Sequence, residues 1–327
     1  MDIADATHLL PPADTPSNRA LLDRLRGAGM PRPHVDPELA GGLREWLEDS
    51  LAGCAASVGR AGRVVRVDSQ LLSASHPHGR LVQGPTPGAV DFARDDVLVS
   101  LVRCIFCQWV TTKNIGRRSG QPFLDAIDSL SVSGDPGGTV EAVNRLSPQR
   151  RKALSDEVTR HAANISATWP VLCPAWYPRT RERISIPLCG GRIRLDCVVD
   201  LVIGAQATEE ATVCLVQVGT ATTNPRANGA ELHFNALLET LRAGAPPCRV
   251  ARYATGSGEL YVEPVDEHIL VGALLETIEV TEKACAVMAE ATIVEHNDSS
   301  ANSKESANSR GSASSRGRPN STGRAKR

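Results

Sequence analysis

The sequence predicts an α/β fold, in which a central sheet is flanked by helices. Two apolar runs rich in β-branched residues, 193–204 and 211–219, are bounded by glycines and turn residues, which is typical of strands. The segment 231–242 follows, with Phe234, Leu237, Leu238 and Leu241 at helical spacing. Gly244 and two prolines then end that helix. Strand, loop, strand and helix are therefore the centre of the predicted fold.

The first part of the chain predicts mainly helices. Residues 1–36 are rich in proline and are expected to form a flexible lead-in. Residues 37–146 form the expected N-terminal region, with helices over 37–58, 95–112 and 121–130 and one strand within 63–72. The helix over 95–112 has an apolar stripe that is too wide for a helix on the surface.

The second part, residues 147–296, predicts the α/β domain itself. Ser147 followed by Pro148 favours the start of a helix that runs to about residue 167. A strand over 183–188 is expected to form a hairpin with residue 193 onward through Gly190-Gly191. Strands over 248–253 and 259–265 follow, and Asp266 is expected to cap a helix that reaches about residue 289.

The composition indicates the cellular location of the protein and the state of its cysteines. Hydrophobic residues make up 41% of the chain, yet no apolar run approaches the length of a membrane-spanning helix, and the start lacks the features of a signal peptide. We therefore expect a cytoplasmic protein with no membrane partner. The nine cysteines are scattered and odd in number, which favours reduced thiols. The Cys104–Cys107 pair lies in an apolar helical run, which favours core packing over a zinc site completed by His76 and His78.

Asp200 lies in the middle of the first apolar strand. A carboxylate among Val, Leu and Ile needs a cation, a metal or good hydrogen-bond donors. One interpretation is that Asp200 caps a turn or pairs with Arg192 or Arg194. The other is that it belongs to a metal site shared with the next strand.

The order of these elements, with Asp200 on one strand and Gln217-Val218-Gly219 on the next, resembles the PD-(D/E)XK nuclease superfamily. The resemblance covers roughly residues 148–290. It implies a restriction-endonuclease-like core with a mixed central sheet, in which Asp200 is a catalytic residue and a ligand for Mg²⁺ or Mn²⁺. It also implies that the second strand carries an acid-x-Lys triplet.

The chain departs from that triplet. Gln217 replaces the acid with a neutral oxygen, which is a poorer ligand for Mg²⁺, and Gly219 replaces the lysine. No lysine lies between Lys152 and Lys283. Arg226 or Arg242 could supply positive charge and hold a substrate, but an arginine cannot act as a base near neutral pH. We therefore expect a degenerate member that has lost hydrolysis and binds nucleic acid, such as DNA, or a protein partner.

An active alternative stays open. Glu157 on the preceding helix could act as a catalytic acid, and Glu231 or Glu239 on the following helix could join Asp200 as metal ligands. That rebuilt site would make the protein an Mg²⁺- or Mn²⁺-dependent DNA nuclease.

Residues 297–327 are expected to form a disordered basic tail, since alanine is their only apolar residue type. Seven basic residues against two acidic ones give this tail a charge of +5, so residues 1–296 carry −6. Such a tail either binds nucleic acid or solubilises the protein.

Overall fold

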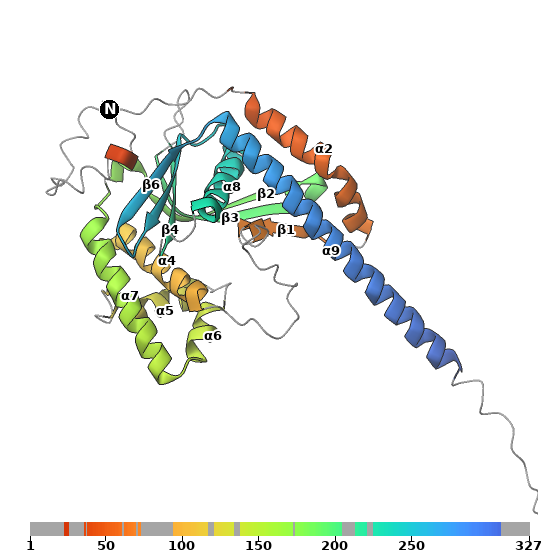
Figure 1. Cartoon of the computed structure of the whole chain (residues 1–327), viewed down its shortest axis with the longest axis horizontal. Helices are drawn as coiled ribbons and strands as arrows, with labels where there is room; N and C mark the ends of the chain where they lie inside the picture. The colour runs from red at the N-terminus through yellow and green to blue at the C-terminus, as the bar shows by residue number, and fades with distance from the viewer. Residues whose placement is uncertain are drawn as a thin grey trace, which may run out of the picture.

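A mixed six-stranded sheet forms the centre of the computed structural model and has helices on both faces (Figure 1). The structure describes residues 23–25, 36, 38–60, 62–69, 71–72, 94–116, 121–133, 138–172, 174–204, 213–220 and 225–308. The α/β class and the mixed sheet predicted from the sequence are confirmed.

The strands are β1 (Val65–Asp68), β2 (Arg179–Leu188), β3 (Ile193–Ile203), β4 (Cys214–Gly219), β5 (Arg249–Ala254) and β6 (Glu259–Pro264). Their order is β1-β3-β4-β5-β6, and β2 pairs with β3. The β1–β3 and β4–β5 pairs are parallel, and the other pairs are antiparallel. The hairpin expected at Gly190-Gly191 is present, with the short helix η3 (Cys189–Gly191) in its turn and φ of 67° and 81° at the two glycines.

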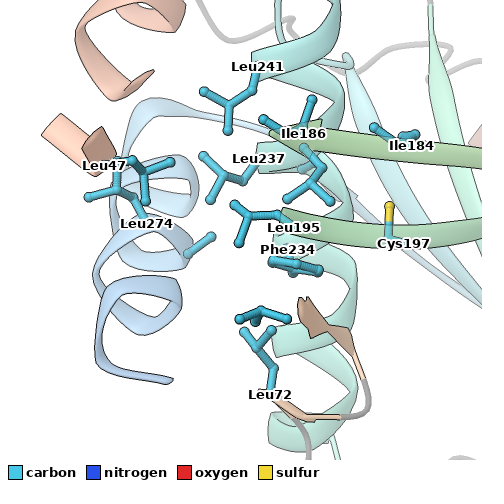
Figure 2. Close-up of a cluster of buried hydrophobic side chains, with 14 of the residues drawn as sticks. Leu47, Leu72, Ile184, Ile186, Leu195, Cys197, Phe234, Leu237, Leu241 and Leu274 are labelled. Carbon is cyan, nitrogen blue, oxygen red and sulfur yellow. The ribbon is translucent and has the colours of Figure 1, made fainter. Parts of the chain in front are cut away.

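On one face, the helices α2 (Leu39–Arg60), α8 (Pro225–Ala243) and α9 (Glu267–Asn308) cover the sheet. Apolar side chains of these helices and of β1, β2 and β3 form the first core (Figure 2). In Figure 2, Leu47 and Leu274 project toward Leu237, Leu195 and Phe234, so all three helices share one apolar layer with the sheet.

On the other face, α4 (Arg94–Thr112), α5 (Pro122–Ser133), α6 (Thr139–Asn144) and α7 (Pro148–Thr168) form a second helical layer. The short helix η2 (Pro174–Trp176) links α7 to β2. This layer packs on β4, β5 and the end of β3 and forms the second core. Trp169 is buried there against the rings of Phe106 and Tyr253, at centroid distances of 4.8 and 4.7 Å. The tryptophan therefore covers the sheet.

Local sequence signals explain the helix starts. The Ser147 side chain accepts a hydrogen bond from the backbone N–H of Arg150 at 3.4 Å, and the Asp266 side chain accepts one from that of Ile269 at 2.9 Å, so both predicted caps are confirmed.

Cys104 and Cys107 are buried in the second core, as expected, while His76 and His78 lie outside the described residues. Helix α9 continues past residue 289 to Asn308, into the segment expected to form the tail, and residues 309–327 lie outside the described part.

Residues 37–146 and 147–296 share the sheet and both cores. Strand β1 pairs with β3, and α2 and α4 contribute to the first and second cores. No described helix combines the length and apolar character that a bilayer crossing requires.

Candidate functional site at the strand fork

Asp200 lies where β3 and β4 separate. The two strands pair only at Leu201↔Val216, Val202↔Leu215 and Ile203↔Cys214. The next pair would join Asp200 and Gln217, but there the Asp200 Oδ2 accepts the backbone N–H of Val218 at 2.8 Å. Strand β1 pairs with β3 only at residues 193–196. The opening beside Asp200, between β3 and residues 217–218 of β4, is called the fork below.

The backbone is distorted at the fork. Arg181, opposite Asp200 on β2, has φ of 55°, and no pairing is formed between Glu182↔Val199 and Thr180↔Leu201. Both Val199 and Val202 pack in the first core, so the inward-outward alternation of β3 changes phase at Asp200. A residue of this type with positive φ is uncommon, and strand irregularities often re-aim a side chain.

Arg103 of α4 fills the fork. Its Nε lies 3.0 Å from the Val218 carbonyl oxygen, to which it donates, and 3.2 Å from Asp200 Oδ2. Its Nη2 donates to Glu231 Oε1 at 3.1 Å. Arg103 belongs to the helical layer of the second core and Glu231 to α8 in the layer of the first, so this ion-pair chain crosses the sheet through the fork.

Burial makes these charges depend on one another. The side chains of Asp200 and Glu231 are 4% and 13% exposed, and that of Arg103 is 30% exposed. Burial raises the pKa of Asp200, against the opposing effects of the Arg103 guanidinium and the Val218 N–H. Burial alone would lower the pKa of Arg103, but the carboxylates of Asp200 and Glu231 raise it above its ordinary value. The guanidinium therefore stays charged.

Gln217 and Arg252 complete the cluster on the α8 side. Gln217 donates through Nε2 to Glu231 Oε1 at 2.9 Å, and its own Oε1 accepts from Asn235 at 3.4 Å. Arg252, whose Nη1 lies 3.5 Å from Glu231 Oε2, is directly opposite Gln217 in the β4–β5 register. A Cβ at Gly219 would lie 2.9 Å from Arg252 Nη2, so the arginine fills the space where a side chain at position 219 would start.

Several residues expected from the sequence are gathered here, and several are not. Asp200, Gln217 and Glu231 meet at the fork. Glu239 lies about 12 Å further along α8 by helical rise, where it pairs with Arg242 at 2.7 Å. Glu157 pairs with Arg160 on α7 at 3.4 Å, whereas the charges that act on Asp200 come from Arg103, Glu231 and Arg181.

Of the two arginines expected to hold substrate, only Arg242 has a described side chain, and it lies away from the fork. Arg242 is engaged by Glu239 and by Glu182 of β2, at 2.8 Å. Arg226 lies on the first turn of α8, and its side chain is outside the described part of the structure. The local pairing of Asp200 with Arg192 or Arg194 is not formed either: Arg194 lies 3.8 Å from Asp196, and Arg192 packs beside Gly59.

The cluster does not fit a divalent metal. Among the described residues, no group of three His, Cys, Asp or Glu side chains is arranged to hold a metal ion. The two carboxylates at the fork already share a guanidinium, and a carboxamide and a second arginine occupy the remaining positions. A site for Mg²⁺ would instead need carboxylate oxygens that are open to the ion.

Sequence reasoning missed Arg103 and Arg252. The available signal was an arginine in a helix whose apolar stripe is too wide for the surface, because a charge in such a helix needs an opposite charge. Asp200 was the matching unpaired charge. Nothing in the sequence indicates that Arg252 would reach across to Gly219.

Compared with known protein families and with curated proteins, the chain matches none. Among solved structures, it is similar to one described as "Crystal structure of SSO0001", with 12% sequence identity and a TM-score of 0.24. That match covers 56% of this chain and 74% of the other. A likeness at this level supports no argument about function.

Proposed function

We propose that this protein is a nuclease-like module that has exchanged its metal ion for a partly buried arginine, and that it binds nucleic acid without cleaving it. A cytoplasmic location is part of the proposal. It agrees with the eight described cysteines being free thiols. The single observation that carries the proposal is the position of Arg103 between Asp200 and Glu231.

Metal entry would be opposed by charge and by geometry. A divalent ion between these carboxylates would have to displace a guanidinium that contacts Asp200, Glu231 and the Val218 carbonyl. It would then lie beside two arginines, since Arg252 is also within 3.5 Å of Glu231. A displaced, partly buried guanidinium would lose both partners, which is costly in a protein interior.

Position 219 supplies no lysine at the fork. In the family that the sequence resembles, a lysine from position 219 would help to orient water and stabilise charge. Arg252 fills that space with a permanent positive charge, and an arginine cannot accept a proton near neutral pH. Burial lowers the pKa of Arg252, and Glu231 acts in the opposite direction. The pair Gly219 and Arg252 thus supplies charge without a base.

The alternative is an active nuclease in which Glu231 has replaced the missing strand acid. The contact of Glu231 with the Asp200 cluster favours this alternative, because a helix acid does reach the fork. It would require Arg103 to leave, and Glu157 and Glu239 are engaged with other arginines.

Metal titration separates the two. Calorimetry with Mn²⁺ is carried out on the wild type, Arg103→Met and the double variant Arg103→Met/Asp200→Asn, beside cleavage assays on plasmid and single-stranded DNA. We expect no Mn²⁺ binding and no cleavage by the wild type, measurable Mn²⁺ binding once Arg103 is removed, and loss of that binding in the double variant. Cleavage by the wild type that disappears in Asp200→Ala would overturn the proposal and establish the active alternative.

A further inference from the structure

Among the described residues, part of the sheet has no helical layer on one face. In β1, β2 and the first half of β3, alternate residues such as Val67, Ile186 and Leu195 point into the first core. The residues between them point to the opposite side, and we call them the open sheet face: Arg66, Asp68, Arg183, Ser185, Pro187, Arg194, Asp196 and Val198. The second core, by contrast, is built on β4, β5 and the end of β3.

The open sheet face is exposed to solvent. Arg66, Arg183 and Arg194 are all exposed, and Val198 retains 40% of its surface although it lies in the central strand. In Figure 1, β1 and the adjoining parts of β2 and β3 extend away from α4, α5, α6 and α7. Helices α2 and α9 pack on the first-core side of these strands.

Two arginines of the open sheet face lie opposite each other, an arrangement that lowers the stability of the fold. Arg66 is directly opposite Arg194 in the β1–β3 register, and like charges at facing positions of neighbouring strands destabilise a sheet. Arg194 Nε lies 3.8 Å from Asp196 Oδ1, a long ion pair. Arg66 and Arg183 have no carboxylate partner among the described residues. The first core and the strand pairing do not account for three arginines at these positions.

The face also differs in sign from the rest of the protein. It carries three arginines against two aspartates, whereas residues 1–296 together carry −6. Arg183 is directly opposite Val198, four residues from Arg194 on β3, so the arginines span about 13 Å along the strands. An anionic polymer could therefore contact them together.

We propose that the open sheet face binds the phosphate backbone of a nucleic-acid strand, with Arg66 and Arg194 holding one phosphate and Arg183 another. The inference rests on the proposed nucleic-acid binding and assigns it a surface separate from the fork. Arginine suits this ligand because its planar guanidinium can donate two hydrogen bonds to one phosphate. Val198 and Pro187 provide apolar surface between the charges for the sugars.

The test compares a variant that lacks the three arginines of the open sheet face with a variant that lacks three arginines elsewhere on the protein. The variant Arg66→Gln/Arg183→Gln/Arg194→Gln is matched with Arg44→Gln/Arg145→Gln/Arg160→Gln, whose arginines lie on helices α2 and α7 and after α6 and form ion pairs there. Both full-length variants lose the same charge and keep the basic tail. Fluorescence anisotropy measures binding of a labelled single-stranded 20-mer over a range of salt concentrations.

We expect the open-face variant to bind at least tenfold more weakly than the wild type. Its slope of log K against log salt should fall by about 1.4, since two phosphate contacts are lost and each contact on a single strand contributes about 0.7. The matched variant should stay within about twofold. A lysine version, Arg66→Lys/Arg183→Lys/Arg194→Lys, should keep most of the salt slope, because it keeps the charges. This version also separates lost charge from lost folding.

Equal losses in the open-face and matched variants would overturn the inference, because general charge would then explain binding. An unchanged slope in the open-face variant, or no binding by the wild type, would also overturn it. Absence of binding by the wild type would also overturn the proposed nucleic-acid binding, whereas the other two results would leave it standing. The metal titration tests the arginine-filled fork independently.

Discussion

Replacing Arg103 with methionine should destabilise the protein by about 3 kcal/mol, since removing one partner of a buried ion pair costs about 3–5 kcal/mol and Arg103 is 30% exposed. Methionine keeps most of the aliphatic length of arginine, so little cavity is left and the loss reports on charge. Asp200 and Glu231 would then share the fork with no guanidinium between them.

The loss should depend on pH in a defined direction. Arg103 is the main charge that opposes the burial-driven rise in the pKa of Asp200, so the pKa of Asp200 should rise further in Arg103→Met. A carboxyl group with a raised pKa in the folded state contributes stability below its unfolded pKa of about 3.9, and this contribution is lost as pH rises through the folded value. The gap between the variant and the wild type should therefore be small near pH 4 and widen toward pH 8.

Urea unfolding at several pH values provides the measurement. Tryptophan fluorescence is the reporter, because one of the four tryptophans, Trp169, is buried against Phe106 and Tyr253. The control is Arg145→Met, which removes an arginine from an ion pair with Glu141 whose side chains are 65% and 69% exposed. That change should cost less than about 1 kcal/mol. Equal costs for the two variants, or a gap that narrows as pH rises, would refute the reasoning.

Three further outcomes are expected. Gly256→Ala should destabilise the protein by about 2 kcal/mol, because a Cβ there would lie 2.5 Å from the Thr220 carbonyl oxygen. Gly219→Ala should cost less, because its Cβ would lie 2.9 Å from the movable end of the Arg252 side chain. Urea midpoints that rank the two the other way would contradict this expectation. Gly53→Ala, in α2 with nothing within 4 Å of the added methyl group, should stabilise the protein by about 1 kcal/mol, and a lower melting temperature would count against it. Burial, together with Arg160, lowers the pKa of His161, so its contribution to stability is present above the ordinary value near 6.5 and is lost as pH falls. An NMR titration of this ring with a midpoint above the ordinary value would show that the sign is wrong.

The sequence predicted those helices and strands whose apolar pattern agrees with the turn and capping residues at their ends. The runs around Asp200 and Gln217 are β-branched and bounded by turn residues, and Asp266 and Ser147 cap helices in the expected way. The short helix α6 was not predicted, because its six residues follow a glycine at φ of 65° and carry no side-chain cap.

The ion pairs of Asp200 and Glu231 could not be predicted from the sequence. The environment of Asp200 depends on Arg103, which lies 97 positions earlier, and no local pattern connects the two. The change of phase in β3 could not be predicted from the sequence either. Every residue from Val198 to Ile203 except Asp200 is apolar, so no alternation of polar and apolar residues indicates which side each one faces. Glu231 was considered as a metal ligand beside Asp200, and it lies at the same cluster, but its pairing with Arg103 and Arg252 was not foreseen.

The path of Arg103 through the sheet also constrains how the chain can assemble. Its side chain leaves one helical layer and ends beside α8 in the other, with β3 and β4 on either side. We therefore expect α4 to reach the sheet before α8 closes over the fork, or the two to dock together. We expect the N-terminal and C-terminal halves to depend on each other for folding, so separately expressed halves should recover native structure only when they are refolded as a mixture.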